Sequence, residues 1–323
     1  MSGFSSGGFF AVQMQVAFSS IIKGAGIVAG GPYHCAAEHL LMYCMASSYS
    51  SLFVDKTASG LLKTLSLSGI TDQLDDVHHM KHHKVYIISG SLDFIITRSV
   101  VNELYRYYVT DGHLVDKENV IYNTQLSAGH TFPTNFDAPG NSLCSITGSP
   151  FVSNCAFDGA GAILKHIYGA NLSDPVVTYP HSVTNTYGDW ITFNQTEFTS
   201  ESLNSIGLAD EGYVYVPKSC QSNTTTKYCR LHIVFHGCSQ SYSTVGDRFM
   251  RNTGYDRWAN TNHLIILFPQ TKIDNVPHLT TFNGWLNNLN GCWDWLGFYG
   301  DDFATKKGAQ MRAIKKMIDR IAS

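Results

Sequence analysis

Three residues of this chain could together transfer an acyl group through a serine nucleophile. Ser5 lies at the centre of segment 3–7, which fits the pattern Gly-x-Ser-x-Gly, and Asp93 and His130 follow it in the chain. In such chemistry a histidine removes the serine proton, and a carboxylate orients the imidazole and stabilises its cation. The residue types and their order predict Ser5 as nucleophile, His130 as base and Asp93 as orienting acid.

The residues around Ser5 predict a sharp turn from a strand into a helix. Glycines flank the serine in such a turn because a side chain there would collide with the neighbouring strand and helix. The apolar run 9–18 contains no helix breaker, so we expect it to form the buried helix behind the turn. The pentapeptide alone is a weak signal, since chain ends rich in Ser and Gly are more often flexible tails.

The strand in front of this turn is not visible in the sequence. Only Met1 and Ser2 precede Gly3, and no signal peptide is present. We therefore expect the supporting strand to be missing, because the sequence is truncated or its start is misassigned.

Asp93 and His130 each follow a predicted strand. The β-branched run 84–89 ends at a glycine turn before Asp93, and the strand 119–123 leads into the glycine-preceded loop that holds His130. Parallel sheets place functional groups at the carboxyl ends of their strands. As an alternative, Asp93 only caps the helix predicted at 97–108.

The composition is that of a globular protein. Of the 323 residues 44% are hydrophobic and 15% are charged, and the net charge is −3 without a basic stripe, so nucleic acid is not an expected partner. No apolar run is long enough for a membrane span.

Strands and helices alternate, which predicts one domain over 1–323 with a polar seam near 170–210. Further strands are predicted at 24–31, 212–217, 229–235 and 263–269, and further helices at 32–45, 158–169, 248–260 and 306–321.

The cysteines and glycosylation sequons favour an oxidising, secretory environment. The eight cysteines form no Cys-x-x-Cys pair of the kind that zinc ribbons use, so we expect disulfides. Sequons begin at Asn171, Asn194 and Asn223, and glycosylated sequons belong to secreted proteins. The protein is therefore expected to be extracellular.

A histidine cluster at 78–83 is a candidate metal site. Its imidazoles recur at a spacing of four residues, which can place two ligands together on a helix. The neighbouring Asp75, Asp76 and Lys84 favour a solvated helix end instead, and we expect no bound metal.

A second motif supplies a candidate oxyanion hole. The strand 229–235 ends in His236-Gly237-Cys238, and in esterases a strand ending in His-Gly leads into a loop whose backbone N–H groups help bind the oxyanion. The N–H groups of Ser6 and Cys238 are the expected donors. This motif normally precedes the nucleophile, whereas here it follows Ser5 in the chain. The simplest explanation is a circularly permuted α/β-hydrolase fold with a mostly parallel sheet covered by helices on both faces.

Taken together, the motifs resemble those of secreted fungal-type polyhydroxybutyrate depolymerases. The resemblance spans nearly the whole chain and implies a monomeric serine esterase, without cofactor, that cuts poly(3-hydroxybutyrate) into oligomers and monomer through an acyl-enzyme. The segments that carry it are 3–8, 30–35, 90–93, 130–134, 158–162, 236–241 and 290–295.

The resemblance also implies disulfide pairings and substrate contacts. It places Trp293 along the substrate crevice with Asn288 beside it, although simple core packing is an alternative role for the tryptophan. The implied disulfides are Cys35–Cys44, Cys144–Cys155, Cys220–Cys229 and Cys238–Cys292.

One part of the chain departs from the family pattern. Leu92 and the segment 94–96 make the surroundings of Asp93 more apolar than the hydroxyl-rich segment of the family. Two alternatives therefore stay open. One is an esterase for feruloyl or acetyl groups on polysaccharides or for synthetic polyester, and the other is an inactive homologue that only binds.

Overall fold

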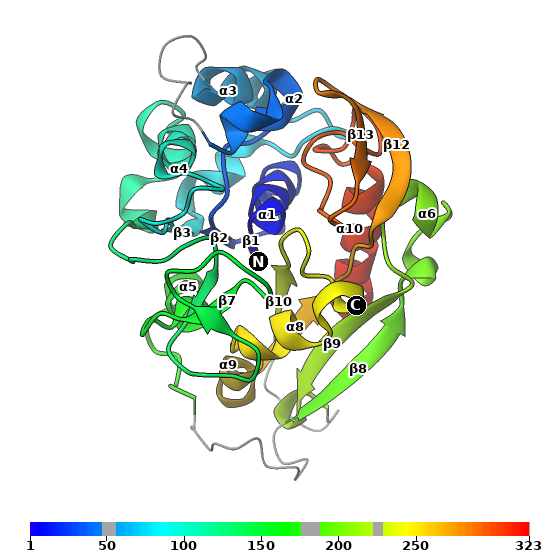
Figure 1. Ribbon diagram of the computed structural model, residues 1–323. Coiled ribbons are helices and arrows are strands. Elements are labelled where there is room, and N and C mark those ends of the chain that lie inside the picture. The colour runs from blue at the N-terminus through cyan, green and yellow to red at the C-terminus, as the bar shows by residue number, and fades with distance from the viewer. Residues whose placement is uncertain (47–55, 176–187, 222–228, 323) are drawn as a thin grey trace.

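The computed structural model describes residues 1–46, 56–175, 188–221 and 229–322, and its centre is an eight-stranded sheet (Figure 1). The strands follow the order β4-β3-β2-β1-β10-β11-β9-β8. All pairings from β4 to β11 are parallel, and β9 pairs antiparallel with both β11 and β8. The strands are β1 (Ser2–Phe4), β2 (Gly24–Val28), β3 (Lys84–Ile88), β4 (Val120–Asn123), β8 (Gly188–Asn194), β9 (Glu211–Pro217), β10 (Arg230–Phe235) and β11 (Leu264–Phe268).

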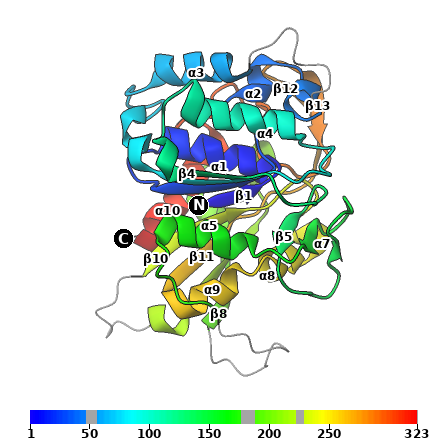
Figure 2. The same cartoon turned by 90° about the vertical axis from the view of Figure 1, so that its left-hand side faces the viewer.

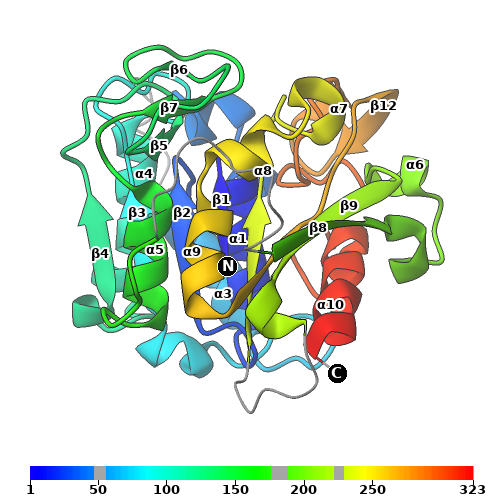
Figure 3. The same cartoon turned by 90° about the horizontal axis from the view of Figure 1, so that it is seen from below.

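Helices cover both faces of this sheet. Figure 2 shows α1, α3 and α4 on one side and α5 and α9 on the other, and Figure 3 shows α5 and α9 in front of the strands. The strands β1, β2 and β3 are almost wholly buried, as apolar strands between two helical layers must be. The helices are α1 (Ser6–Ala17), α2 (Cys35–Glu38), α3 (Lys56–Leu67), α4 (Arg98–Tyr105), α5 (Gly159–Tyr168), α6 (Leu203–Ile206), α7 (Tyr242–Val245), α8 (Arg248–Asn252), α9 (Tyr255–Asn262) and α10 (Ala309–Ala322).

Two small sheets and several short turns complete the fold. One small sheet is the hairpin of β12 (Asp274–Thr280) and β13 (Gly284–Asn288), and the other has three short strands. These three strands are β5 (Phe132–Thr134), β6 (Ser142–Leu143) and β7 (Val152–Asn154). Single turns of 3-10 or π helix occur at Leu41–Cys44, Val77–His82, Arg106–Thr110, Lys117–Asn119, Gln195–Phe198 and Lys218–Cys220.

The strand in front of Ser5 is present, contrary to the sequence expectation. β1 has only three residues, but it lies in the middle of the sheet and pairs with β2 on one edge and with β10 on the other. The Ser2 hydroxyl adds buried hydrogen bonds to His232 (2.9 Å) and Tyr255 (2.6 Å). A strand that is hydrogen-bonded along both edges and buried on both faces needs few residues of its own, which is why the count of preceding residues misled the prediction.

The order of the strands confirms the permuted α/β-hydrolase topology. β10 carries the His236-Gly237-Cys238 motif at its end and lies directly beside β1, although the two strands are more than 220 residues apart in the sequence. The predicted polar seam contains β8 and α6, and its residues 176–187 lie outside the described residues. None of the helices in the described ranges is both long and apolar enough to cross a membrane.

Candidate active site

Ser5 lies in a strained turn between β1 and α1. Its backbone has φ 55° and ψ −123°, a conformation that is uncommon for any residue other than glycine. The flanking glycines make this turn possible. A Cβ on Gly3 would lie 2.0 Å from the carbonyl oxygen of Gly7, and a Cβ on Gly7 would lie 2.4 Å from that of His236. The turn therefore tolerates no side chain at either glycine.

The structure brings Ser5, His130 and Asp93 into one hydrogen-bonded series. The Ser5 hydroxyl lies 2.9 Å from Nε2 of His130, and Nδ1 of the same ring lies 2.8 Å from Oδ2 of Asp93. The other carboxylate oxygen of Asp93 accepts the N–H groups of Ile95 and Ile96, both at 2.9 Å. These two bonds hold the carboxylate toward the imidazole. Asp93 therefore does more than cap a helix, because its second oxygen faces the base.

The three side chains are together because of the parallel sheet. Asp93 follows β3 and His130 follows β4, so both lie at the edge where the parallel strands end. Ser5 follows β1 at the same edge. All three residues are at most 8% exposed, which keeps bulk water from competing for their hydrogen bonds.

Aromatic rings fix the plane of the His130 imidazole. The ring of Phe4 lies 4.6 Å from it between centroids, and Phe151 meets it edge-on at 6.4 Å. The backbone N–H of His130 donates to the Thr147 hydroxyl. With Asp93 on Nδ1, these contacts leave Nε2 directed at Ser5.

A backbone peptide beside Ser5 has a fixed orientation. The carbonyl of Gly237 accepts a hydrogen bond of 2.7 Å from Nδ1 of His236. In a planar trans peptide the N–H points opposite to the carbonyl, so this bond also sets the direction of the Cys238 N–H. The peptide is close to the nucleophile, because a Cβ on Gly237 would lie 3.1 Å from the Cβ of Ser5.

His236 is held in the tautomer that this hydrogen bond requires. The N–H of Thr271 lies 3.3 Å from Nε2 of His236, which therefore acts as acceptor and leaves the proton on Nδ1. Burial lowers the pKa of His236 to about 4, so the ring is neutral in the fold at neutral pH. The Thr271 hydroxyl in turn donates to the carbonyl of Gly291 at 2.5 Å.

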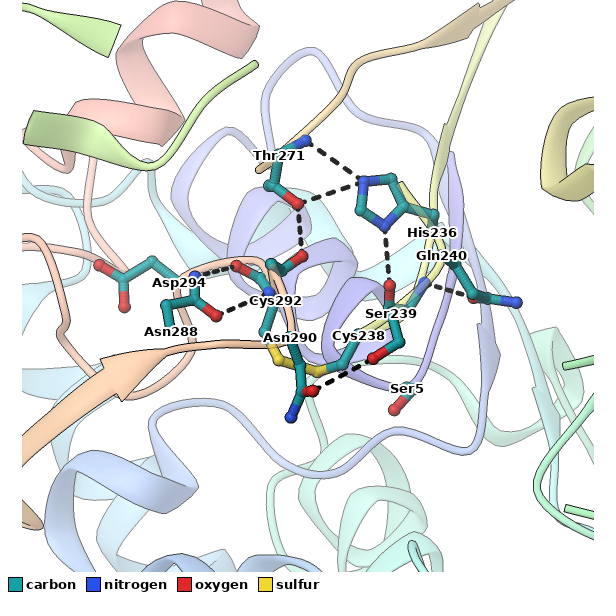
Figure 4. The surroundings of a disulfide bond; sticks show 12 residues. Ser5, His236, Cys238, Ser239, Gln240, Thr271, Asn288, Asn290, Cys292 and Asp294 are labelled. Atoms are coloured by element: carbon teal, nitrogen blue, oxygen red, sulfur yellow. Dashed lines mark hydrogen bonds between the residues drawn. A yellow bond between two sulfur atoms is a disulfide. The ribbon is translucent and has the colours of Figure 1, made fainter. Parts of the chain in front are cut away.

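The disulfide Cys238–Cys292 joins this loop to the segment after β13 (Figure 4). The N–H of Ser239 donates to the carbonyl of Asn290 at 2.6 Å, beside the disulfide. The structure also joins the other cysteines in the pairs that the resemblance implied. These pairs are Cys35–Cys44, Cys144–Cys155 and Cys220–Cys229.

The second expected donor lies at the start of α1. Ser6 is the first residue of this helix, and the first N–H groups of a helix have no partner within it. Among the described residues, neither the N–H of Ser6 nor that of Cys238 has a hydrogen-bond acceptor. Two unpaired donors next to a serine hydroxyl form a site that can bind an oxyanion.

The structure does not place Trp293 and Asn288 along a crevice. Trp293 is fully buried and packs against Phe10 and Phe235, so its role in the structure is core packing. Asn288 is 1% exposed, and its amide is used by the N–H and carbonyl of Cys292. Neither side chain is accessible from the surface in this structure, and their contact with a substrate stays a prediction.

Gln240 is a residue near the site that the sequence did not single out. It is 1% exposed, and its side-chain oxygen accepts the N–H of Gly237 at 2.6 Å. It belongs to the segment 236–241 that carries the family pattern, but the pattern gave this glutamine no role. Its other partners are about 90 residues away, and no local pattern shows them.

Exposed apolar side chains lie on segments that carry or adjoin the site residues. Leu92 and Phe94 flank Asp93. Leu289 precedes Asn290, whose carbonyl accepts the Ser239 N–H. Leu143 and Ile146 lie on either side of Cys144 in the sequence. The carbonyl of Cys144 accepts the N–H of Gly129, the residue before His130. Phe94 also lines an apolar cleft of about 420 Å³. Its lining consists of Leu40, Leu41, Met42, Met45, Ala46, Phe94, Ile95 and Asn283.

Two histidines of the cluster contact carboxylates. His78 lies 2.6 Å from Asp76, and His82 lies 2.8 Å from Asp116. Across the ranges that the structure describes, no three His, Cys, Asp or Glu side chains are arranged to hold a metal ion. The segment is a short 3-10 helix, and the side chains of His78 and His82 are exposed.

Known proteins that resemble this chain are polyhydroxybutyrate depolymerases. The chain is 41% identical over its full length to polyhydroxybutyrate depolymerase from Talaromyces funiculosus, of which it covers 89%. It is 39% identical to poly(3-hydroxybutyrate) depolymerase from Delftia acidovorans, and it spans 59% of that longer protein. No protein-family profile matches the chain.

Solved structures give the same result. The crystal structure of PHB depolymerase from Penicillium funiculosum superposes with a TM-score of 0.88 at 40% identity, covering 98% of this chain and 93% of that one. A serine-to-alanine variant of a PHB depolymerase in complex with an R3HB trimer gives a TM-score of 0.87 at 40% identity, with coverage of 99% and 93%.

The fold and the site define a circularly permuted α/β hydrolase with a serine, a histidine and an aspartate in contact. The sequence identity to polyhydroxybutyrate depolymerases, over the full length of this chain, then narrows the assignment from this class to one family. The chain belongs to the polyhydroxybutyrate depolymerase family.

Proposed function

We propose that the protein is an extracellular serine esterase that hydrolyses poly(3-hydroxybutyrate)-type polyesters to oligomers and monomer. The observation that carries this proposal is the contact series from Ser5 through His130 to Asp93, next to two unpaired backbone N–H groups. The polymer class follows from the family, whose relatives are named for it, and from the R3HB trimer bound by one of them.

The first half of the reaction forms an acyl-enzyme. Nε2 of His130 accepts the Ser5 proton as Oγ attacks the ester carbonyl, and Asp93 stabilises the imidazolium that results. The carbonyl oxygen becomes an oxyanion, which accepts hydrogen bonds from the N–H groups of Ser6 and Cys238. When the tetrahedral species collapses, the ester bond breaks and His130 gives its proton to the departing hydroxyl end of the polymer.

The second half releases the acyl group. His130 removes a proton from a water molecule as the water oxygen attacks the acyl carbon of Ser5. The same two N–H groups bind the second oxyanion. His130 then returns the proton to Ser5 Oγ, which frees the carboxylic acid product and restores the enzyme.

Contact with the polymer is assigned to the exposed apolar side chains around the site. Phe94 is 64% exposed and Leu143 is 74% exposed, and they belong to the loops that carry Asp93 and adjoin His130. Contact between such side chains and the apolar surface of a polyester is favourable, because it removes apolar area from water. The enzyme acts as a monomer in this proposal.

Secretion is supported by the cysteines and by two sequons. Four disulfides persist in oxidising compartments and are rare in the cytosol. The side chains of Asn171 and Asn194 are exposed, as glycosylation requires, and Asn223 lies outside the described residues.

Clearing of a turbid poly(3-hydroxybutyrate) suspension tests the function. The wild type is expected to clear it, and Ser5→Ala is expected to lose at least about 10³-fold in rate because the nucleophile is absent. A serine-reactive phosphonate should modify Ser5 in the folded wild type.

The same preparation separates the alternatives. Release of feruloyl or acetyl groups from xylan without clearing of the suspension would identify an esterase for other substrates. Absence of phosphonate labelling and of any ester hydrolysis would identify an inactive homologue. Full activity of Ser5→Ala would reject the site itself.

A further inference from the structure

The buried amide of Gln240 connects the two sides of the candidate active site. Its Oε1 accepts the Gly237 N–H at 2.6 Å, and its Nε2 donates to the carbonyls of Pro150 (2.7 Å) and Phe151 (3.3 Å). Figure 4 shows Gln240 beside Cys238, on the loop that faces Ser5. One side chain therefore binds two backbone segments that are about 90 residues apart.

The first of these segments carries one expected oxyanion donor. Gln240 holds the N–H of Gly237, and the next peptide along the chain contains the Cys238 N–H. The fit is tight, because a Cβ on Gly237 would lie 2.8 Å from the Gln240 oxygen and 3.1 Å from the Ser5 Cβ. A shift of Gln240 would therefore move the peptide that faces the nucleophile.

The second segment contacts the base. Phe151 packs edge-on against the His130 ring, and its carbonyl also accepts the N–H of Phe132, two residues after that histidine. Phe151 has a φ of 57°, a conformation that needs support from its surroundings. Two of the hydrogen bonds that hold this segment in place come from Gln240 and Phe132.

We propose that Gln240 is a positioning residue that sets the oxyanion-binding peptide of Gly237 and Cys238 at its working distance from His130. The inference rests on the proposed function of Ser5 and adds a determinant of its turnover rate. Gln240 contacts no reacting atom, and it acts through Gly237 on one side and Phe151 on the other.

Only a side chain with an acceptor at one end and a donor at the other can make both contacts. Glutamate keeps the acceptor for Gly237, but it can donate to the Pro150 carbonyl only when it is protonated. Burial without a cation raises the pKa of a carboxyl, so Gln240→Glu should reproduce the glutamine at low pH and lose one contact at high pH. Methionine of similar length makes neither hydrogen bond at any pH.

The test compares Gln240→Glu and Gln240→Met with a matched pair at Gln195. Gln195 is also fully buried, accepts a backbone N–H from Gln270 (3.0 Å), and donates to the carbonyls of Ala209 (2.6 Å) and Gln270 (2.8 Å). Active sites are counted by phosphonate titration, so that only folded enzyme contributes. The kcat and KM for soluble p-nitrophenyl butyrate are then measured at pH 5 and pH 8, each relative to the wild type at the same pH.

At pH 8 we expect kcat per titrated site of Gln240→Glu to fall about 10- to 100-fold, part of the effect of losing an oxyanion donor. Its KM should stay within about 3-fold, because the contact acts on the transition state. At pH 5 its relative kcat should return to within about 3-fold of the wild type, whereas Gln240→Met stays low at both pH values. Gln195→Glu and Gln195→Met should lose stability and keep kcat per site.

The proposal is overturned if both Gln240 variants lose stability but keep the wild-type kcat per titrated site at pH 5 and pH 8. A Gln240→Glu variant that is equally impaired at both pH values would also reject it. The proposed function fails by a different result, which is the absence of phosphonate labelling of Ser5 in the wild type.

Discussion

At the scale of single residues, the site depends on hydrogen bonds whose direction is already fixed before substrate arrives. Asp93 is held by two backbone N–H groups, and His130 is held by Asp93 and by two aromatic rings. His236 directs one peptide toward Ser5 in the same way. Preorganised donors of this kind need no reorganisation when charge develops in the transition state.

Replacement of His236 tests whether this peptide orientation matters. His236→Asn can keep a donor near the position of Nδ1, whereas His236→Ala removes it and leaves the carbonyl of Gly237 unpaired. We expect kcat of His236→Ala to fall about 10-fold with KM nearly unchanged, and its free energy of unfolding to fall by about 2–3 kcal/mol.

The asparagine variant is the control for this prediction. It should recover most of the kcat per titrated site even if some stability is lost. Equal kcat values for the alanine variant and the wild type would show that the His236 bond serves folding alone.

The residue scale also shows which contacts a sequence can predict and which it cannot. Ser5, Asp93 and His130 could be predicted because each belongs to a short local motif at a strand end. Gln240 could not, since its partners are distant carbonyls. The burial of Trp293 could not be predicted either, because closely spaced aromatic residues look alike in a sequence and only the fold decides which of them points into the core.

At the scale of elements, the site is a meeting of loops from the ends of parallel strands. The pairing of β10 with β1 could be predicted from the His236 motif, which had to lie beside Ser5. The length of β1 could not, because three residues suffice only when both neighbouring strands are already in place. The hairpin of β12 and β13 was not predicted from the sequence either.

The disulfides allow a test at this scale. Cys238–Cys292 has a sequence separation of 54 and joins the oxyanion loop to the segment after β13, whereas Cys220–Cys229 has a separation of 9 and lies away from the site. Removal of either pair, by serine at both positions, should lower the free energy of unfolding by about 2–4 kcal/mol.

Activity should separate the two disulfide variants. The Cys238→Ser/Cys292→Ser variant is expected to lose kcat about 10-fold or more per titrated site, because its loop is no longer tied. The Cys220→Ser/Cys229→Ser variant should keep the wild-type kcat. Similar kcat values for the two variants would contradict the role given to the oxyanion loop.

At the scale of the whole molecule, buried titratable side chains set the response to acid. Burial lowers the pKa of His34 to about 3 and of His236 to about 4, and that of His232 well below its ordinary value. Burial also raises the pKa of Asp256 and Asp294 to about 6. The histidines must take up protons when the chain unfolds in acid, whereas the two carboxyls release them.

The histidines decide the sign of the pH dependence. Their contribution to stability is complete above the unfolded pKa of about 6.5 and decreases as the pH falls below it. His83, whose pKa burial also lowers to about 4, adds to this loss, and the two carboxyls offset only part of it. The free energy of unfolding should therefore fall as the pH is lowered from 6 to 5. Guanidinium unfolding followed by tryptophan fluorescence measures this slope.

A variant at His34 tests whether the buried histidines cause this loss of stability in acid. His34 has a φ of 62°, which asparagine tolerates, so His34→Asn removes one protonation with little backbone strain. Its slope between pH 6 and 5 should be smaller by about 1.4 kcal/mol per pH unit. An unchanged slope would show that other groups control the acid response.

The most direct test of the account is to trap the acyl group on the enzyme. The wild type is mixed with an R3HB oligomer, quenched in acid within one turnover, digested and analysed by mass spectrometry. The account predicts a 3-hydroxybutyryl ester on Ser5, which is absent from Ser5→Ala and does not build up in His130→Ala, because His130 is also the base of the acylation step. Hydrolysis of the oligomer with the acyl group on another residue, or with none on the protein, would contradict it.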